Sequence, residues 1–367
     1  MRKQKLLYII HGIRTGGAEV AFLSALVELE ETYDFKAIVL GKSNERLLDV
    51  IPNRVKSKLE RYEYTLPVLC LHLPAILRSI RQFSPDIMLS SLWRSAVPAI
   101  LYKRFNSTVR YGVIIHSSRF FHTADWFFTT RAVRYADAIY VDSDATKQFV
   151  HKRVDIKCEI QVLSFITSKA TDKIEASSQS EIRFCFVGRL HNVKNVPRAV
   201  EVIGWLRRQG IDARFDIYGR DDGDWAFIKK AIQMRRLDNY VNWKGEFFPE
   251  ERSSVLSNYD FYIQLSSHEG RAMAVIEAMQ HGLVCFVTPV GDIPVYINHM
   301  ENGVLIDIKD ETHWKASLRL IRNVISDVEL RRQIAESGRR YFAGKSNFSG
   351  DLIDALHEFS GYYNTVR

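Results

Sequence analysis

Short apolar runs alternate with amphipathic stretches along this chain, and this alternation constrains its fold more than any other feature. It is the pattern of strands and helices in a doubly wound α/β sheet. In the first part, strands are expected at residues 6–10, 36–40, 86–90, 111–116 and 138–142, and helices at 18–30, 74–82 and 145–152. In the second part, strands are expected at 183–187, 214–218, 261–265, 284–288 and 303–306, and helices at 196–208, 224–236, 274–281 and 311–322.

The same plan occurs twice, and the chain is long enough for two domains. Its 367 residues exceed the roughly 250 to 300 that one hydrophobic core usually supports. The polar stretch 168–180 is the expected linker between one Rossmann-like domain at 1–168 and another at 181–345. The last segment, 346–367, contains an expected helix that fits no unit of the second domain and is expected to cross back to the first. Two such domains facing each other form a central ligand cleft.

Composition excludes several classes of protein. With 46% apolar and 26% charged residues, the chain is neither disordered nor fibrous. The apolar run at 6–10 is too short for a signal peptide or a membrane span, so we expect a cytoplasmic protein. The cysteines lie far apart without a C-x-x-C pair, so reduced thiols are expected rather than a zinc site or disulfides. They are Cys70, Cys158, Cys185 and Cys285.

The basic charge is confined to the first half of the chain. Residues 1–170 contain 25 Lys and Arg against 16 Asp and Glu, a net of +9, whereas the remainder contains 26 against 27. Such asymmetry favours an anionic partner for the first half, namely a membrane surface, a phosphorylated acceptor or nucleic acid. A basic face that only aids solubility is the alternative.

Several turns at the ends of predicted strands could hold an anionic ligand. Gly16 and Gly17 join the first strand to the first helix, where helix amides can face an anion, although a plain tight turn has the same sequence. After the first strand of the second half, Gly188 opens a loop that carries Arg189 and Lys194. A guanidinium fork and an ammonium point charge together suit a diphosphate.

Two glutamates follow a later strand of the second half. Glu269 lies in the expected strand-to-helix loop, and Glu277 lies eight residues further on among apolar neighbours. A carboxylate in apolar surroundings needs a partner, because its desolvation costs several kcal/mol. Paired ribose hydroxyls would satisfy Glu277, and so would a nearby arginine or backbone amides.

Other short motifs do not support a cofactor or a metal. G-x-G-x-x-G is absent from the sequence, and the Gly-Lys-Ser triplets at 41–43 and 344–346 lack the earlier P-loop glycine. The acidic pair Asp142 and Asp144 fits a helix start, and the pair Asp222 and Asp224 fits a turn. No metal site is therefore expected.

Read in order, these segments resemble the retaining GT-B glycosyltransferases of the family-4 type, also called glycosyltransferase group 1. The resemblance covers nearly the whole chain, and the spacing of Glu269 and Glu277 together with the Arg189 and Lys194 loop is its most specific part. The other matching segments are Gly16-Gly17-Ala18-Glu19, residues 136–143, Tyr218-Gly219, Trp243-Lys244-Gly245 and Asn302-Gly303.

The resemblance implies a nucleotide diphosphate sugar as substrate, with UDP or GDP expected, and no cofactor. Arg189 and Lys194 would neutralise the diphosphate, and Glu277 would bind the ribose. Glu269 and the amides after it would hold the donor sugar. His116 would contact the sugar or the acceptor, although a histidine after a strand is often only a satisfied polar residue. The remaining implied donor-binding residues are Gly16, Gly17, Gly188, Gly219, Lys244, Gly270, Arg271, Ala272 and Met273.

The sequence departs from the family pattern in two places. Glu269-Gly270-Arg271-Ala272 replaces the usual Glu-Gly-Phe-Gly, and Gly291-Asp292-Ile293-Pro294 replaces the usual Gly-Gly-Pro-Glu. Both changes fall in the donor domain, so they leave the identity of the donor open.

The first domain is expected to bind the acceptor, a glycan or lipid-linked glycan. Residues 119–131 place aromatic side chains between Arg119 and Arg131. This pattern suits a membrane interface at the inner face of the plasma membrane, or core packing of a helix. No nucleic-acid module is present. The expected function is retaining glycosyl transfer in envelope polysaccharide assembly. The alternatives are another GT-B enzyme, such as a nucleotide-sugar epimerase, and a nucleotide-sugar-binding protein without turnover.

Overall fold

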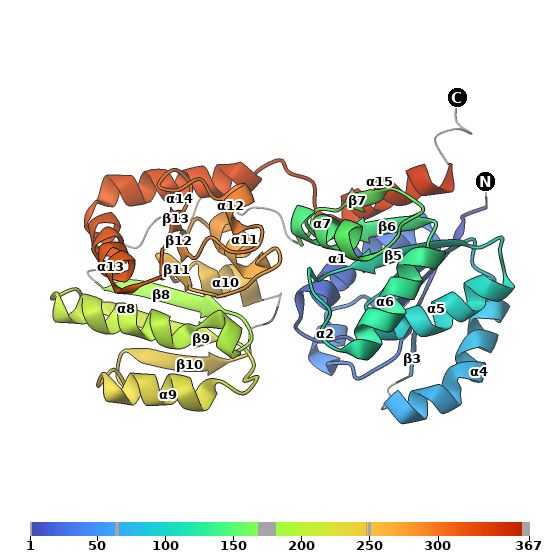
Figure 1. The fold of residues 1–367 in the computed structure, drawn as a ribbon, viewed down its shortest axis with the longest axis horizontal. Helices are drawn as coiled ribbons and strands as arrows, with labels where there is room; N and C mark the ends of the chain where they lie inside the picture. Colours follow the sequence, from blue (N-terminus) through green and yellow to red (C-terminus); the bar gives the residue numbers. More distant parts are fainter. Residues whose placement is uncertain (1, 63–65, 168–180, 247, 249–250, 362–367) are drawn as a thin grey trace. The chain divides into compact units, whose positions relative to one another are not determined.

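The computed structural model describes residues 2–62, 66–167, 181–246, 248 and 251–361. The expected linker at 168–180 and the end of the last segment, 362–367, lie outside the described residues. The chain divides into two compact units, Met1–Thr167 with Ser346–Arg367, and Ser168–Lys345. Each unit is a parallel sheet covered by helices, so the predicted α/β class with two doubly wound sheets is confirmed (Figure 1).

The first unit contains a seven-stranded parallel sheet in the order β3-β2-β1-β4-β5-β6-β7. Its central strands are buried along nearly their whole length because helices cover both faces. The strands are β1 (Lys5–Ile10), β2 (Asp34–Val39), β3 (Leu59–Arg61), β4 (Ile87–Ser91), β5 (Arg110–Ile115), β6 (Ala138–Val141) and β7 (Ile160–Val162). The helices are α1 (Gly17–Thr32), α2 (Glu45–Asp49), α3 (Asn53–Lys56), α4 (Leu66–Phe83), α5 (Trp93–Phe105), α6 (Thr123–Tyr135) and α7 (Asp144–Arg153).

The second unit contains a six-stranded parallel sheet in the order β10-β9-β8-β11-β12-β13. Phe184, Phe261 and Phe286 stack across three neighbouring strands at its centre. The strands are β8 (Ile182–Val187), β9 (Ala213–Tyr218), β10 (Val241–Gly245), β11 (Phe261–Gln264), β12 (Val284–Val287) and β13 (Val304–Leu305). The helices are η1 (Asn192–Lys194), α8 (Val196–Arg208), α9 (Trp225–Met234), α10 (Arg252–Leu256), α11 (Met273–Gln280), α12 (Ile293–Tyr296), α13 (Glu311–Ser326) and α14 (Val328–Phe342).

In both sheets the strand order reverses next to the first strand. β1 lies between β2 and β4, and β8 lies between β9 and β11. Loops leaving the carboxyl ends of these neighbours diverge to opposite faces, and this switch point is where open α/β sheets bind ligands.

Helix α15 (Phe348–Ser360) packs on α1 of the first unit, where the end of the chain is drawn in red (Figure 1). The Phe348 amide donates to the Ile166 carbonyl at 2.8 Å, and the Ser349 hydroxyl donates to the Glu28 carboxylate at 2.6 Å. Phe348, Leu352 and Leu356 are fully buried. The apolar face of α15 is therefore part of the first unit's core.

The central strands and the edge strand β13 lie within two residues of the predicted positions, whereas the other edge strands, β3, β7 and β10, were not predicted. β3 and β7 have three residues each and are only partly buried, so they lack a long apolar run. The predicted helix at 74–82 was too short, because Pro74 was taken as a helix start and lies inside α4. Helices α5, α6 and α14 were also missed. Pro98 lies inside α5, and α14 is strongly charged.

Three cysteines, Cys158, Cys185 and Cys285, are free thiols as predicted. The side chain of Cys70 lies outside the described part of the chain. No helix among the described residues is both long and apolar enough to cross a bilayer.

Ala272 precedes α11 in a left-handed conformation, with φ of 53° and ψ of 60°. This position corresponds to the glycine of the family pattern. The left-handed conformation costs a residue with a Cβ atom roughly 1 to 2 kcal/mol. Glycine avoids this cost, which explains why a glycine there suits the turn.

Replacing Ala272 with glycine should therefore raise the free energy of unfolding by up to about 1 kcal/mol. The gain from the relieved backbone exceeds the roughly 0.4 to 1 kcal/mol that glycine adds to unfolded-chain entropy. Ala274→Gly, two residues later inside α11, should lower stability by about 0.5 to 1 kcal/mol. Urea unfolding of both variants tests this contrast, and equal destabilisation would contradict it.

Candidate functional site

Three loops meet by backbone contact at the carboxyl ends of β8, β9 and β10. The Gly188 amide donates to the Tyr218 carbonyl at 2.9 Å, and the Gly219 amide donates to the Gly245 carbonyl at 2.6 Å. A Cβ atom on Gly219 would lie 1.8 Å from the Gly188 carbonyl oxygen, and its φ is +137°. Only glycine fits this contact, so the predicted residues Gly188 and Gly219 shape the loop edge.

The loop after β8 brings Lys194 onto Glu269. Both carboxylate oxygens of Glu269 lie 2.8 Å from the Lys194 Nζ, and the Gln264 amide donates to one of them at 2.9 Å. The Ser267 amide also donates to the Val193 carbonyl at 2.8 Å, which ties the loops after β8 and β11 together. Glu269 is buried. The predicted cation and the first predicted glutamate are therefore direct partners.

Arg189 lies at the start of the same loop and is more exposed. Its guanidinium pairs with Asp222 at 2.9 Å, and 54% of its side-chain surface remains accessible. Asp222 comes from the loop after β9 and also lies 4.0 Å from Arg220. An exposed ion pair of this kind is weak, about 0 to 1 kcal/mol. Arg189 can exchange this carboxylate for a ligand anion at little cost.

Glu277 lies in the second turn of α11 and is buried. Its carboxylate oxygen Oε1 is 2.9 Å from a guanidinium nitrogen of Arg252, the first residue of α10. Burial raises the pKa of Glu277 above its ordinary value, and the Arg252 cation acts in the opposite direction. A nearby arginine was one of the partners expected for Glu277, because a buried carboxylate needs one, and the structure identifies it as Arg252. No local pattern in the sequence singles out Arg252.

The loop that carries Gly270, Arg271 and Ala272 packs on Gly291. The Asp292 amide donates to the Gly270 carbonyl at 2.9 Å, and the Tyr296 hydroxyl donates to the Arg271 carbonyl at 3.0 Å. A Cβ atom on Gly291, which has a φ of +59°, would lie 2.3 Å from the Gly270 carbonyl oxygen. This glycine of the altered Gly-Asp-Ile-Pro segment therefore supports the loop between Glu269 and Met273, at the start of α11.

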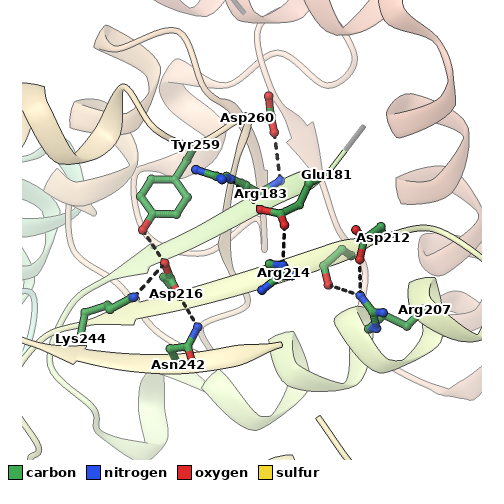
Figure 2. Close-up of polar contacts among 11 residues, drawn as sticks. Glu181, Arg183, Arg207, Asp212, Arg214, Asp216, Asn242, Lys244, Tyr259 and Asp260 are labelled. Atoms are coloured by element: carbon green, nitrogen blue, oxygen red, sulfur yellow. Dashed lines mark hydrogen bonds and ion pairs between the residues drawn. The ribbon is translucent and has the colours of Figure 1, made fainter. Parts of the chain in front are cut away.

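Lys244 lies apart from these contacts, on the edge strand β10. Its Nζ is 3.7 Å from Asp216, which also accepts hydrogen bonds from Tyr259 at 2.8 Å and Asn242 at 2.9 Å (Figure 2). Among the described residues, no contact joins Lys244 to Arg189, Lys194 or Glu269. The structure thus places Lys244 in a polar network on the strands β9 and β10.

In the first unit, Gly16 and Gly17 begin α1 beside a buried carboxylate. A Cβ atom on Gly16 would lie 2.4 Å from a carboxylate oxygen of Glu19. Glu19 lies 3.9 Å from the Nε2 atom of His11 at the end of β1. Burial, together with nearby Arg94 and Arg14, lowers the pKa of His11 to about 4. His11 is therefore neutral near pH 7.

His116 follows β5 at the same edge of the first sheet. Its Nε2 atom is 2.6 Å from the Ser91 hydroxyl, and the edge of its ring contacts Phe165 at 5.1 Å between centroids. The Nδ1 atom is buried without a hydrogen-bond partner in the part of the chain that the structure describes. Burial, with a smaller effect of His11, lowers the pKa of His116 to about 3. His116 is thus a neutral imidazole with one nitrogen engaged.

The aromatic segment at 119–131 divides into an exposed and a buried half. Within it, Asp125 and Thr130 of α6 are buried, and so are the next residues of the helix, Ala132 and Val133. The exposed half, which we call the α6 patch, is Arg119, Phe121, Trp126, Phe127 and Arg131. Its three aromatic side chains are 61%, 49% and 39% exposed in that order. The guanidinium carbons of the two arginines lie 4.9 Å and 4.2 Å from the ring centroids of Phe121 and Phe127.

The two acidic pairs, Asp142 with Asp144 and Asp222 with Asp224, are engaged in other contacts. Asp142 accepts a hydrogen bond from Ser143, and Asp144 begins α7. Asp222 pairs with Arg189, and Asp224 is the cap of α9. Within the described ranges, no group of three His, Cys, Asp or Glu side chains is arranged to hold a metal ion.

Several known proteins are similar to this chain, and two of them are glycosyl-transferring enzymes of bacteria. N-acetyl-alpha-D-glucosaminyl L-malate synthase of Bacillus anthracis is 24% identical over 245 residues, which are 64% of this chain and 61% of that enzyme. The GtfA subunit of the Streptococcus pneumoniae UDP-N-acetylglucosamine–peptide N-acetylglucosaminyltransferase is 28% identical over 139 residues, 37% of this chain and 27% of that protein. The chain thus aligns with less than two thirds of either relative's length.

The crystal structure of Anabaena HepE in complex with UDP and glucose matches the fold of this chain. The TM-score is 0.80 at 13% identity, over 97% of this chain and 100% of HepE. At this identity the match concerns the fold alone, and it confirms the expected GT-B type.

Two family models divide the chain between them. The model described as Glycosyltransferase Family 4 matches residues 15–164, and the model described as Glycosyl transferases group 1 matches residues 168–341. The second match includes Arg189, Lys194, Glu269 and Glu277, the residues on which the resemblance depended most. The chain belongs to the group 1 glycosyltransferases.

Proposed function

We propose that this protein is a retaining, metal-independent glycosyltransferase that moves a sugar from a nucleotide diphosphate to a hydroxyl of a glycan or lipid-linked glycan. The supporting observation is the gathering of Arg189, Lys194, Glu269 and Glu277 at one sheet edge. They lie on the loops and the helix that follow β8 and β11, the neighbouring strands at the switch point. Open α/β sheets bind ligands at this place.

The proposed chemistry depends on stabilising the leaving group. The bond between C1 of the sugar and the β-phosphate oxygen breaks, and negative charge builds on the departing nucleotide diphosphate. Arg189 and Lys194 provide fixed cations for that charge, which lowers the barrier without a metal. The acceptor hydroxyl attacks C1 from the face that the diphosphate leaves, and its proton passes to the departing phosphate oxygen, so the anomeric configuration is retained. Neutral His116 can exchange hydrogen bonds with the sugar or acceptor hydroxyls.

The two relatives favour one donor as the first to test. Both carry N-acetylglucosaminyl in their names, and one name includes UDP-N-acetylglucosamine. Among UDP and GDP sugars, UDP-N-acetylglucosamine is therefore the first choice. A nucleotide-sugar epimerase would need no acceptor, and a binding protein without turnover would bind the donor and leave it intact.

A donor screen tests this function. UDP, GDP and ADP sugars should be compared by thermal shift of the full chain, and then by nucleotide release with and without glycan or polyprenyl-diphosphate-glycan acceptors, in excess EDTA. We expect one donor to stabilise the protein and acceptor-dependent release of its nucleotide, with a product of unchanged anomeric configuration. Conversion of the donor without an acceptor would support the epimerase instead.

Arg189→Ala should slow turnover by about tenfold to a hundredfold, because a charge-assisted hydrogen bond contributes roughly 1.5 to 3 kcal/mol. Arg189 is the better probe of the diphosphate role, since loss of Lys194 would also leave buried Glu269 without its cation. Arg214→Ala removes an arginine of similar exposure, 45% against 54%, which pairs with Glu181 at the other end of the sheet (Figure 2). It should leave turnover unchanged. Full activity of Arg189→Ala would show that Arg189 does not stabilise the leaving diphosphate.

The two glutamates should have separable effects. Glu277→Gln should weaken binding of the free nucleoside diphosphate and of the nucleotide sugar alike, by about tenfold, through lost ribose contacts. Glu269→Gln should chiefly reduce sugar transfer. Calorimetry with UDP or GDP, alongside turnover, measures the difference. Unchanged nucleotide affinity in a folded Glu277→Gln variant would show that the ribose role is wrong.

We also propose that the α6 patch docks reversibly on anionic lipid at the inner face of the plasma membrane. Exposed aromatic side chains with adjacent arginines suit the interface between headgroups and acyl chains. Among the described residues, neither Arg119 nor Arg131 has a carboxylate partner, so both are available to lipid phosphates. Each cation contributes about 1 kcal/mol near an anionic surface.

Co-sedimentation of the full chain with phosphatidylglycerol-containing and with neutral phosphatidylcholine vesicles tests the docking. Binding should require the anionic lipid and should fall at high salt, because surface charges are screened within about 8 Å at physiological ionic strength. The double variant Arg119→Ala with Trp126→Ala should lose it, and Arg214→Ala should keep it. If equal amounts of protein sediment with both types of vesicle, or none sediments with either, docking on anionic lipid is rejected and a soluble glycan acceptor is favoured.

A further inference from the structure

The ion pair between Arg252 and Glu277 is buried on both sides. Their side chains are 9% and 11% exposed, and the closest nitrogen and oxygen lie 2.9 Å apart. No other carboxylate among the described residues pairs with Arg252, and its buried Nε atom has no hydrogen-bond partner there. Removing a charge pair from water costs several kcal/mol per ion. Because Glu277 is also the predicted ribose contact, we look for a function of this costly buried pair in ligand binding.

Contacts of His281 join α10 to α11 and so fix the side from which Arg252 reaches Glu277. His281, four residues after Glu277, lies 2.8 Å from the Glu277 carbonyl oxygen through Nδ1 and 3.3 Å from the Ser253 hydroxyl through Nε2. The first turn of α10 is thus joined to the turn of α11 that carries Glu277. The closest contact of Arg252 is to Oε1 of the carboxylate, at 2.9 Å.

A buried carboxylate without a cation tends to take up a proton, because burial disfavours the charged form. The protonated form has fewer acceptor sites for the two hydroxyls of a ribose. A neighbouring guanidinium keeps the carboxylate ionised, and it remains protonated at every relevant pH. Arg252 therefore has the chemistry to preserve the acceptor capacity of Glu277.

We propose that Arg252 is a positioning residue that holds Glu277 as a carboxylate, ready to accept hydrogen bonds from the ribose of the nucleotide. This inference rests on the ribose assignment made above. Among the described residues, the ionisable groups that contact this part of α11 are Arg252 from α10, His281 from α11 itself and the Cys285 thiol, which lies 3.9 Å from the Val275 carbonyl oxygen. Burial raises the pKa of the Cys285 thiol. Burial lowers the pKa of His281, its hydrogen bond to the Glu277 carbonyl acts in the opposite direction, and the Arg252 cation lowers it further. His281 is present in every variant below, so a double variant separates its titration from that of Glu277.

The test is the pH dependence of binding. Calorimetry at about pH 6 and about pH 8 should use UDP-N-acetylglucosamine and GDP-mannose, whose diphosphate diesters do not titrate between these values. The affinity of the unmodified protein for the sugar that it binds should change by less than about twofold. Arg252→Gln raises the carboxyl pKa of Glu277, so the ionised fraction falls as pH falls. Its affinity should be about tenfold lower at the acidic pH than at the basic pH.

Two further variants assign the effect to Glu277. Arg252→Gln with Glu277→Gln should bind weakly and equally at both pH values. Arg252→Lys, which keeps a cation on a shorter side chain, should show a smaller loss of about threefold in the same direction. It also serves as the test if Arg252→Gln does not fold, in which case a flat profile would overturn the proposal.

Three results would overturn the proposal. The first is an Arg252→Gln profile as flat as that of the unmodified protein. The second is equal weakening at both pH values, which would mean that Arg252 touches the ligand itself. The third is a pH dependence that persists in the double variant. Normal binding by Glu277→Gln alone would instead reject the ribose assignment, so the two failures are distinguishable.

Discussion

The close approach of backbone to backbone at the sheet edge is the constraint on which the second unit's site depends. Gly219 lies against the Gly188 carbonyl, and Gly291 lies against the Gly270 carbonyl. Because no Cβ atom separates these segments, the loop after β8 lies against the loop after β9, and the loop after β11 lies against the loop after β12. The Ser267 amide, which donates to the Val193 carbonyl, joins the two pairs of loops into one rim. The charged side chains of Arg189, Lys194 and Glu269 project from this rim, so their positions depend on these backbone contacts as well as on their own ion pairs.

The charged residues of the rim have partners within the protein. Lys194 contacts Glu269, Arg189 contacts Asp222, and Arg252 contacts Glu277. The three pairs differ in exposure, and exposure decides how readily each can rearrange. The Arg189 pair is screened by solvent and exchanges partners easily, whereas the Arg252 pair is buried, and breaking it would leave an uncompensated charge. A ligand anion would therefore recruit Arg189 first and leave the Arg252 pair intact.

The sequence alone predicted the central strands, the two sheets and most of the rim residues, because long apolar runs and glycine turns are local signals. It did not predict the edge strands β3, β7 and β10, and it did not identify Arg252 as the arginine that pairs with Glu277. β3 and β7 exist because a neighbouring strand offers backbone partners, and that neighbour is distant in sequence. Arg252 meets Glu277 only after β11 has crossed between α10 and α11. The hydrophobic periodicity of the sequence is a local signal and does not indicate such a contact between distant residues. Lys244 was assigned to the ligand from a matching segment, and the structure places it beside Asp216, so that assignment stays a prediction.

The return of α15 to α1 means that the second unit is inserted into the first rather than appended to it. The first unit cannot bury Phe348, Leu352 and Leu356 until residues 348–360 have been synthesised, after every residue of the second unit. On the ribosome, the second sheet can therefore complete its core while the first still exposes the apolar surface of α1. The order of folding would run against the order of translation, and chaperones would encounter the N-terminal unit for longer than its place in the chain suggests.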